Sequence, residues 1–162
     1  MKRIAQFEKV SQAQFEAAYS GRELPDYDSI RLPRRATAGS AGYDFFAPYP
    51  LIVKPGETVT VPTGIRVSME EGWVLKLYPR SGLGFKYRLQ LNNTVGIIDS
   101  DYYYSDNEGH IFIKISNDSY EDKTVTVAAG DAFAQGIFVE YGITVDDDAT
   151  AIRNGGFGST TR

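Results

Sequence analysis

The sequence lacks several residue types that particular chemistries require. It contains no cysteine, which excludes disulfide bonds and thiolate metal sites. Histidine occurs once, and we interpret His110 as a residue at the start of a strand rather than as a metal ligand. There is no run of about 18 apolar residues that could span a membrane, and the start MKRIAQFEKV has too short an apolar stretch for a signal peptide. We therefore expect a cytoplasmic protein that does not bind membranes.

Positive charge is not in excess either. The 162 residues include 17 Lys and Arg against 21 Asp and Glu, for a formal net charge of -4. Nucleic-acid-binding proteins concentrate basic residues, so no nucleic-acid partner is expected and any phosphate site must be local. Hydrophobic residues at 42% and aromatic residues at 13% indicate a globular chain, whose length is typical of one domain.

The first thirty residues differ from the rest. The stretch SQAQFEAAYSG predicts a short helix, with Ser11 as N-cap, Gln14 closing a capping box and Gly21 as the stop signal. We expect residues 1–30 to form a helical appendage, residues 31–150 the core domain, and residues 151–162 a flexible C-terminal lid.

From Ala41 onward, short β-type runs alternate with turn signals, and no helical period of useful length returns. In HIFIKIS, the side chains of Ile111, Ile113 and Ile115 share one face, which is the period of two that a strand requires. The other runs are TVTVP, IRVSM, WVLKLY, TVGII, KTVTVA and FAQGIFV. The pattern predicts an all-β domain, either a sandwich or a jelly roll.

Four glycine-containing segments carry polar groups beyond the needs of a turn. Asp44 lies between aromatic residues in SAGYDFFA, where it could also be an edge residue that caps a turn. Arg80 and Ser81 flank glycine in YPRSGLGFK, which suits a phosphate nest or equally a surface hairpin. In AAGDAFAQGIF, the amide of Gln135 needs partners among apolar neighbours and could simply bond to the backbone.

The segment NNTVGIIDSDYYYS is the most informative. An apolar strand runs into Asp99, a position in which a carboxylate can hold a water for general-base attack. Tyr102 offers a flat ring for a sugar or a base. An Asp-Ser-Asp turn and a row of tyrosines on a sheet face are the alternatives.

In this order, AGYD, PRSGLG, VGIIDSDY, GD-x-x-AQ and GGFGST resemble the five motifs of the trimeric dUTP pyrophosphatase (dUTPase) family. The resemblance covers about three quarters of the chain, from Ala41 to Thr160. It implies a jelly roll of the distorted β-barrel type and a homotrimer with active sites shared between subunits. It also implies Mg²⁺-dependent hydrolysis of dUTP to dUMP and pyrophosphate.

The resemblance also implies roles for individual residues. Asp99 would activate the water that attacks the α-phosphate, Tyr102 would stack beneath the deoxyribose and exclude a 2′-hydroxyl, and Phe157 would cover the uracil ring. Asp44 would support the region of the metal and phosphates without direct ligation, because Mg²⁺ would be held by the substrate phosphates and water. Uracil recognition falls to Asn93, Gly96 and Ile97, and phosphate binding to Arg80, Ser81, Gly82, Gln135, Arg153, Gly158, Ser159 and Thr160.

The chain departs from the family pattern at three places. Ala132 stands where the fourth motif usually has arginine. Arg153 is four residues before Phe157 instead of five, and Arg162 could substitute for it. The segment 102–110 is longer than the usual hairpin, which suggests an enlarged loop near the site.

Two alternatives remain beside hydrolysis of dUTP. A dCTP deaminase shares the fold implied by the resemblance, but that family has an acidic residue in a strand where IFIKISN has Lys114. A regulatory β-domain that binds nucleotides without turnover is the other, and the presence of Asp99 argues against it.

Overall fold

The computed structural model describes residues 1–155, and most of their regular structure is β. All pairs of neighbouring strands are antiparallel. The strands are β1 (Ala5–Lys9), β2 (Arg34–Arg35), β3 (Tyr43–Phe46), β4 (Leu51–Val53), β5 (Thr58–Pro62), β6 (Ile65–Met69), β7 (Trp73–Pro79), β8 (Leu89–Leu91), β9 (Gly96–Ile98), β10 (Phe112–Asn117), β11 (Val125–Val127) and β12 (Ala132–Glu140). The helices are α1 (Gln12–Ala18) and α2 (Ser81–Tyr87), with 3-10 turns η1 (Tyr27–Ser29) and η2 (Ser100–Tyr104).

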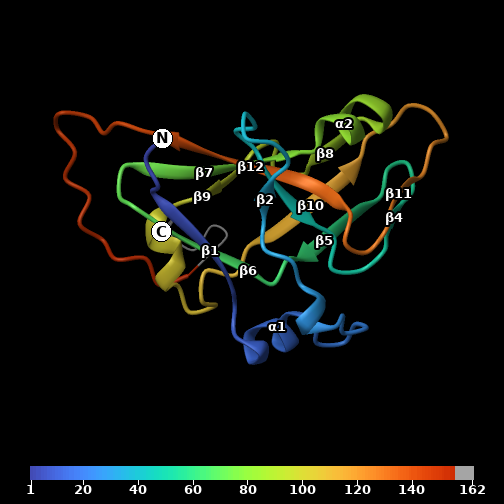
Figure 1. The fold of residues 1–162 in the computed structure, drawn as a ribbon, viewed down its shortest axis with the longest axis horizontal. Helices are drawn as coiled ribbons and strands as arrows, with labels where there is room; N and C mark the ends of the chain where they lie inside the picture. The colour runs from blue at the N-terminus through green and yellow to red at the C-terminus, as the bar shows by residue number, and fades with distance from the viewer. Residues whose placement is uncertain (156–162) are drawn as a thin grey trace.

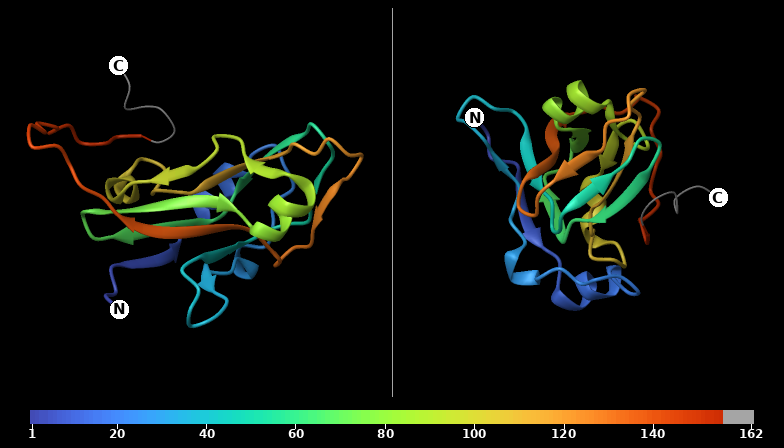
Figure 2. Two further views of the ribbon diagram at one scale, coloured as in Figure 1. Left: turned by 90° about the horizontal axis from the view of Figure 1, so that it is seen from above. Right: turned by 90° about the vertical axis from the view of Figure 1, so that its right-hand side faces the viewer.

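The strands form four hydrogen-bonded groups rather than one closed barrel in the part of the chain that the structure describes (Figures 1 and 2). The largest is a five-stranded sheet in the order β2-β3-β12-β7-β9. A three-stranded sheet has the order β5-β10-β8, and the pairs β1-β6 and β11-β4 complete the set. The prediction of a mostly β fold is confirmed.

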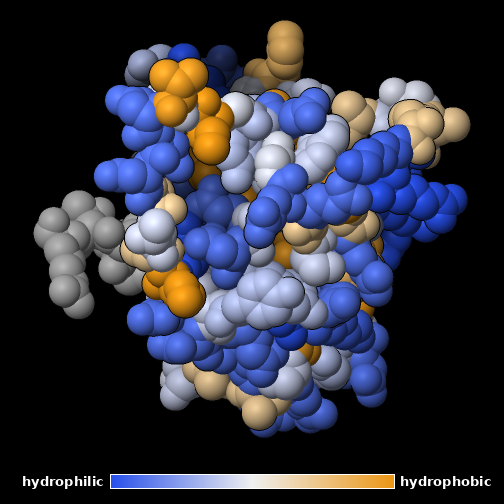
Figure 3. Space-filling model, turned by 90° about the vertical axis from the view of Figure 1, so that its left-hand side faces the viewer, coloured by the Kyte–Doolittle hydropathy of each residue, from blue (hydrophilic) through white to orange (hydrophobic). Residues whose placement is uncertain are grey.

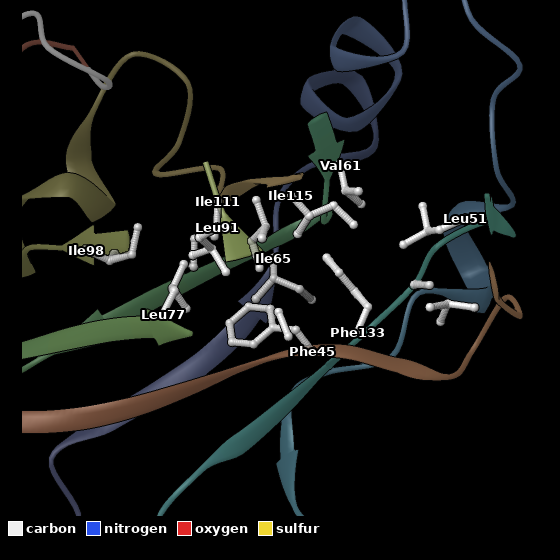
Figure 4. Packing of buried hydrophobic residues seen from close by; sticks show 14 of the residues in the cluster. Phe45, Leu51, Val61, Ile65, Leu77, Leu91, Ile98, Ile111, Ile115 and Phe133 are labelled. Atoms are coloured by element: carbon white, nitrogen blue, oxygen red, sulfur yellow. The ribbon is translucent and has the colours of Figure 1, made fainter. Parts of the chain in front are cut away.

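The core lies where side chains from these sheets meet. Ile111, Ile113 and Ile115 are all buried and Lys114 is exposed, as the period of two predicts. Figure 4 shows Phe45 of β3 beside Ile65 of β6, and both belong to one continuous cluster of buried apolar residues. Burial of such side chains contributes roughly 1.5–3 kcal/mol each, so this cluster is what holds the separate sheets together.

The N-terminal segment contains the predicted helix, but a separate appendage is not what the structure shows. The Ser11 side chain caps α1 by accepting a hydrogen bond from Gln14 N at 3.2 Å. Strand β1, which the sequence did not indicate, pairs with β6. Phe15 and Tyr19 are fully or almost fully buried in the main core cluster. Residues 5–19 are therefore integrated into the β domain.

The segment PRSGLG is also different from the expectation. It is helical rather than a hairpin turn, because α2 spans Ser81–Tyr87 and its C-cap Arg88 has a left-handed φ of 51°. None of the helices in residues 1–155 is long and apolar enough to cross a membrane.

Candidate active site

A cavity of about 340 Å³ lies beside β7, β9 and β10. It brings together six residues to which the sequence assigned a role: Asn93, Gly96, Ile97, Asp99, Tyr102 and Arg153. Three polar or aromatic lining residues were not predicted as site residues, namely Asn92, Phe112 and Lys114. Asn92 adjoins Asn93 in sequence, which was an available signal. Phe112 and Lys114 come from the distant strand β10, where Lys114 O accepts a hydrogen bond from Asn92 N at 2.8 Å.

The turn before β9 forms one wall of the cavity. Thr94 bridges back to Leu91 and has a φ of 70°, so the chain reverses within very few residues. A Cβ atom at Gly96 would lie 2.9 Å from the Cβ of Leu77 on the neighbouring strand, which is closer than side chains normally approach. Glycine at this position therefore lets β9 lie tightly against β7 and keeps the wall narrow.

Asp99 follows β9 directly, as predicted for a carboxylate at a strand end. It occupies the N-cap position of η2, and its side chain is 46% exposed. The guanidinium of Arg153 donates to Asp99 Oδ2 from Nη2 at 2.5 Å and to Asp101 Oδ1 from Nε at 2.9 Å. The cavity thus offers a carboxylate and a cation in direct contact.

Tyr102 forms part of the cavity wall and is buried. Its hydroxyl donates to His110 O at 2.7 Å and accepts from Asn107 Nδ2 at 2.9 Å. Burial raises the pKa of this phenol above its ordinary value, opposed by the hydrogen bond from Asn107 and by the charge of Arg153. The ring is consequently fixed and neutral at physiological pH.

The other predicted residues form a second group at the opposite end of β7. Gln135 pairs with Asp44 across β12 and β3, and its Nε2 donates to Pro79 O at 3.2 Å. Arg80 Nε lies 3.7 Å from Asp44 Oδ1 in an ion pair. Ser81 and Gly82 open α2 and are exposed.

The two groups are well separated within one chain. Ile98 pairs with Leu75 near the start of β7, so Asp99 lies near Val74, whereas Arg80 follows the last residue of β7. Six residues of extended strand span about 20 Å. Figures 1 and 2 agree, because η2 and α2 lie at opposite ends of the molecule in both.

Ala132, which stands in place of the arginine usual in the fourth motif, is nearly buried and pairs with Phe46. The guanidinium of Arg31 stacks on the Phe46 ring at 3.9 Å from the ring centroid. It also donates to Gly130 O at 2.7 Å. A cation from another segment therefore lies close to the position where the motif lacks one.

Most residues of the fifth motif lie in the part of the chain that the structure does not describe. Phe157, Gly158, Ser159 and Thr160, and the alternative cation Arg162, lie outside the described residues. Among residues 1–155, no three His, Cys, Asp or Glu side chains are grouped so that they could hold a metal ion.

Fold and cavity together define a mostly β protein with a small-molecule site built on a narrow β turn, a carboxylate, a buried tyrosine and a cation. Comparison with known proteins identifies the family within this class. The family model of dUTPase matches residues 28–161. A deoxyuridine 5′-triphosphate nucleotidohydrolase from Lactococcus lactis is 41% identical over 134 residues, covering 81% of this chain and 88% of that protein. Its counterpart from Haemophilus ducreyi is 40% identical over 146 residues, with coverage of 85% and 88%.

Solved structures give the same result. The crystal structure of a dUTPase from Streptococcus mutans aligns with a TM-score of 0.67 at 36% identity, covering 87% of this chain and 98% of that one. A mutant dUTPase from phage phi11 of S. aureus, described as coordinating a structural Mg(II) ion, shares the fold with a TM-score of 0.65 at 22% identity, covering 92% and 98%. The chain belongs to the dUTPase family, and its activity is the hydrolysis of dUTP.

Proposed function

We propose that Asp99 is the general base of this hydrolysis and activates the water that attacks the α-phosphate, releasing dUMP and pyrophosphate. The observation that carries the proposal is that Asp99, Tyr102, Asn93 and Gly96 line one cavity. A half-exposed carboxylate beside apolar strand residues can hold a water and accept its proton. The ion pair with Arg153 orients this carboxylate.

In this proposal, the turn around Asn93 reads the polar edge of uracil, with Gly96 and Ile97 contributing backbone groups. The close approach of β9 to β7 makes this wall narrow, which would exclude the methyl group of thymine. The Tyr102 ring, held at its hydroxyl from two sides, packs beneath deoxyribose and leaves no space for a 2′-hydroxyl. Discrimination against UTP would therefore rest on shape.

In this proposal, the substrate phosphates are bound by Arg80, Ser81, Gly82 and Gln135, with Arg153 as a further cation. Because about 20 Å along β7 separates Arg80 from Asp99, one chain cannot place both on adjacent phosphates of a single substrate. We infer that the substrate binds between subunits, in a homotrimer of jelly-roll domains. The face drawn in Figure 3 is mostly hydrophilic, with a few separate apolar groups. Exposed apolar residues of the segment after β12 include Ile143, Val145 and Ile152.

We further propose that Mg²⁺ binds together with the substrate. It binds phosphate oxygens and retains water, and when bound it would offset the charge of the triphosphate. Asp44 fits the supporting role, because it is largely buried beside Arg80 and could orient waters of the ion. We propose further that residues 156–162 complete the site, with Phe157 on uracil, and that the enzyme acts in the cytoplasm.

Pyrophosphate release tests the assignment. The purified protein with Mg²⁺ should release pyrophosphate from dUTP and far less from UTP, dTTP or dCTP. Equal rates with dUTP and UTP would contradict the role of Tyr102, and turnover of dCTP to a deaminated product would favour the deaminase alternative.

A further inference from the structure

The loop that carries Tyr102 is attached to the N-terminal segment at two points. Tyr103 Oη donates to Glu8 Oε2 at 2.8 Å. Glu108 accepts two hydrogen bonds from Ser11, one from the backbone N at 2.7 Å and one from Oγ at 2.6 Å. Residues almost a hundred positions apart in sequence are therefore in direct contact at two points of the loop that follows Tyr102.

Glu108 replaces the partner that the capping box would have supplied from Gln14. Ser11 Oγ still accepts from Gln14 N, but the backbone N of Ser11 is bound by Glu108. The hydrogen bonds from Ser11 lower the pKa of the Glu108 carboxyl group below its ordinary value, so this group is ionised at neutral pH. Glu108 also has a φ of 60°, which a residue with a side chain adopts at a cost and keeps when its surroundings hold it there.

Tyr103 is held in a similar way by β1 and β6. Glu8 and Arg66 are opposite each other in the register of these two strands. While Glu8 accepts from the Tyr103 hydroxyl, the Arg66 guanidinium lies 3.6 Å from the centre of the Tyr103 ring and donates from Nη2 to Tyr103 O at 3.0 Å. Both the ring and the backbone of Tyr103 are thereby fixed.

The loop transmits this restraint to Tyr102 because it is tightly closed. Asn107 donates to the Tyr102 hydroxyl and accepts from Gly109 N at 3.2 Å. A Cβ atom at Gly109 would lie 2.7 Å from Tyr103 Cα and 2.8 Å from Tyr102 O, so the two ends of the loop pack backbone against backbone. A shift of Tyr103 or Glu108 must therefore also displace Tyr102.

We propose that Glu8 and Ser11 of the N-terminal segment, acting through Tyr103 and Glu108, are positioning residues that set how strictly the enzyme prefers dUTP to UTP. None of the four is assigned to touch the substrate. The inference rests on the proposed function of Tyr102 as the group that excludes the 2′-hydroxyl. In this inference, the N-terminal segment contributes to the preference for dUTP over UTP.

The test compares kcat/KM for dUTP and for UTP in single variants. Glu108→Ala removes both acceptors for Ser11, and Tyr103→Phe removes the bond to Glu8 but retains the ring over Arg66. We expect each to lower the ratio of kcat/KM for dUTP to that for UTP by roughly tenfold, because misplacement by about 1 Å can cost up to a hundredfold in rate. Glu108→Gln keeps an acceptor oxygen and should restore most of the ratio. Asp106→Ala is the matched control, an exposed carboxylate of the same loop.

Ser11→Ala combined with Glu108→Ala should lower the ratio no further than Glu108→Ala alone, since the two residues act as one unit. Equal losses for both substrates, together with a lower unfolding temperature, would show a merely structural role and overturn the inference. Tyr102→Leu separates the two hypotheses. If it leaves the ratio unchanged, the proposed function of Tyr102 is wrong. If it lowers the ratio while Glu108→Ala does not, the positioning role is wrong.

Discussion

Arg153 Nη2 lies 2.5 Å from Asp99 Oδ2, and the same guanidinium reaches Asp101 through Nε. The residue with the least regular motif spacing therefore contacts the proposed general base directly. The Arg153 side chain is 18% exposed and the Asp99 side chain 46%, so the contact is partly shielded from solvent. It places a cation where a phosphate oxygen would approach Asp99.

Arg153→Ala should lower kcat/KM for dUTP by roughly tenfold to a hundredfold. A guanidinium that can bind two oxygens of a phosphate is lost, and Asp99 loses the group that orients it. Arg153→Lys keeps the positive charge but not the two-pronged guanidinium, and its kcat/KM for dUTP should lie between those of the wild type and Arg153→Ala. Steady-state kinetics measures this, with Asp101→Asn as the control that removes the second carboxylate. A kcat/KM that is unchanged or higher in Arg153→Ala would mean that Arg153 merely restrains Asp99.

Asp99→Asn should lose turnover by several orders of magnitude while still binding a non-hydrolysable dUTP analogue. The amide cannot accept the proton of the attacking water, whereas uracil and sugar contacts rest on other residues. Single-turnover kinetics and calorimetric titration with the analogue measure the two properties separately. Near-normal turnover would show that another group is the base.

Mixing two inactive variants should restore activity. In the proposed homotrimer, Asp99→Asn and Arg80→Ala would each disable every site of their own assembly. In a mixed trimer, a site between subunits can combine Asp99 of one chain with Arg80 of another, because the two groups lie at opposite ends of β7. Co-expression with two different tags, followed by tandem purification, yields the mixed species for a pyrophosphate assay. Activity no higher than that of the separate variants would contradict a shared site.

Much of the β fold was predictable because burial imposes a period of two on it. The runs at 58–62, 65–69 and 73–78 coincide with β5, β6 and β7 to within a residue. Helix α2 was not predictable from the sequence, because its two glycines oppose helix formation and the helix depends on tertiary contacts. Strand β1 was missed for a similar reason, since it is five residues long and is defined by its pairing with β6.

In the candidate site too, features with a local sequence pattern were predictable, and contacts between distant segments were not. Asp99 was predictable as a carboxylate after an apolar strand, and the structure places it there. Its contact with Arg153 joins residues 54 positions apart, and the bonds between Ser11 and Glu108 join residues 97 apart. No local pattern encodes such contacts, so the sequence could indicate candidate side chains but not how they hold one another.

The stability of the protein should fall as the pH drops from 7 to 5, because of His110. The imidazole is fully buried, and its Nε2 accepts a hydrogen bond from Gly64 N at 2.8 Å. Burial lowers the pKa of His110 from 6.5 to about 4, opposed in part by the charge of Glu108. The folded chain therefore stays neutral at this residue while the unfolded chain takes up a proton. The stabilisation is fully present above pH 6.5 and is lost progressively as the pH falls toward 4.

Between pH 7 and pH 5, this difference corresponds to about 2 kcal/mol in the free energy of unfolding, since one pKa unit is worth about 1.4 kcal/mol. Denaturant unfolding at fixed protein concentration measures it, because association into the proposed homotrimer would also contribute. His110→Gln keeps an acceptor for Gly64 N but cannot titrate. This variant should be less stable at pH 7 and should lose less stability than the wild type by pH 5. Glu108 does not confound the result, because its pKa is lowered from 4.5 on folding and its contribution is therefore lost mainly below that pH. Parallel stability curves for the two proteins over this range would show that His110 does not cause the loss.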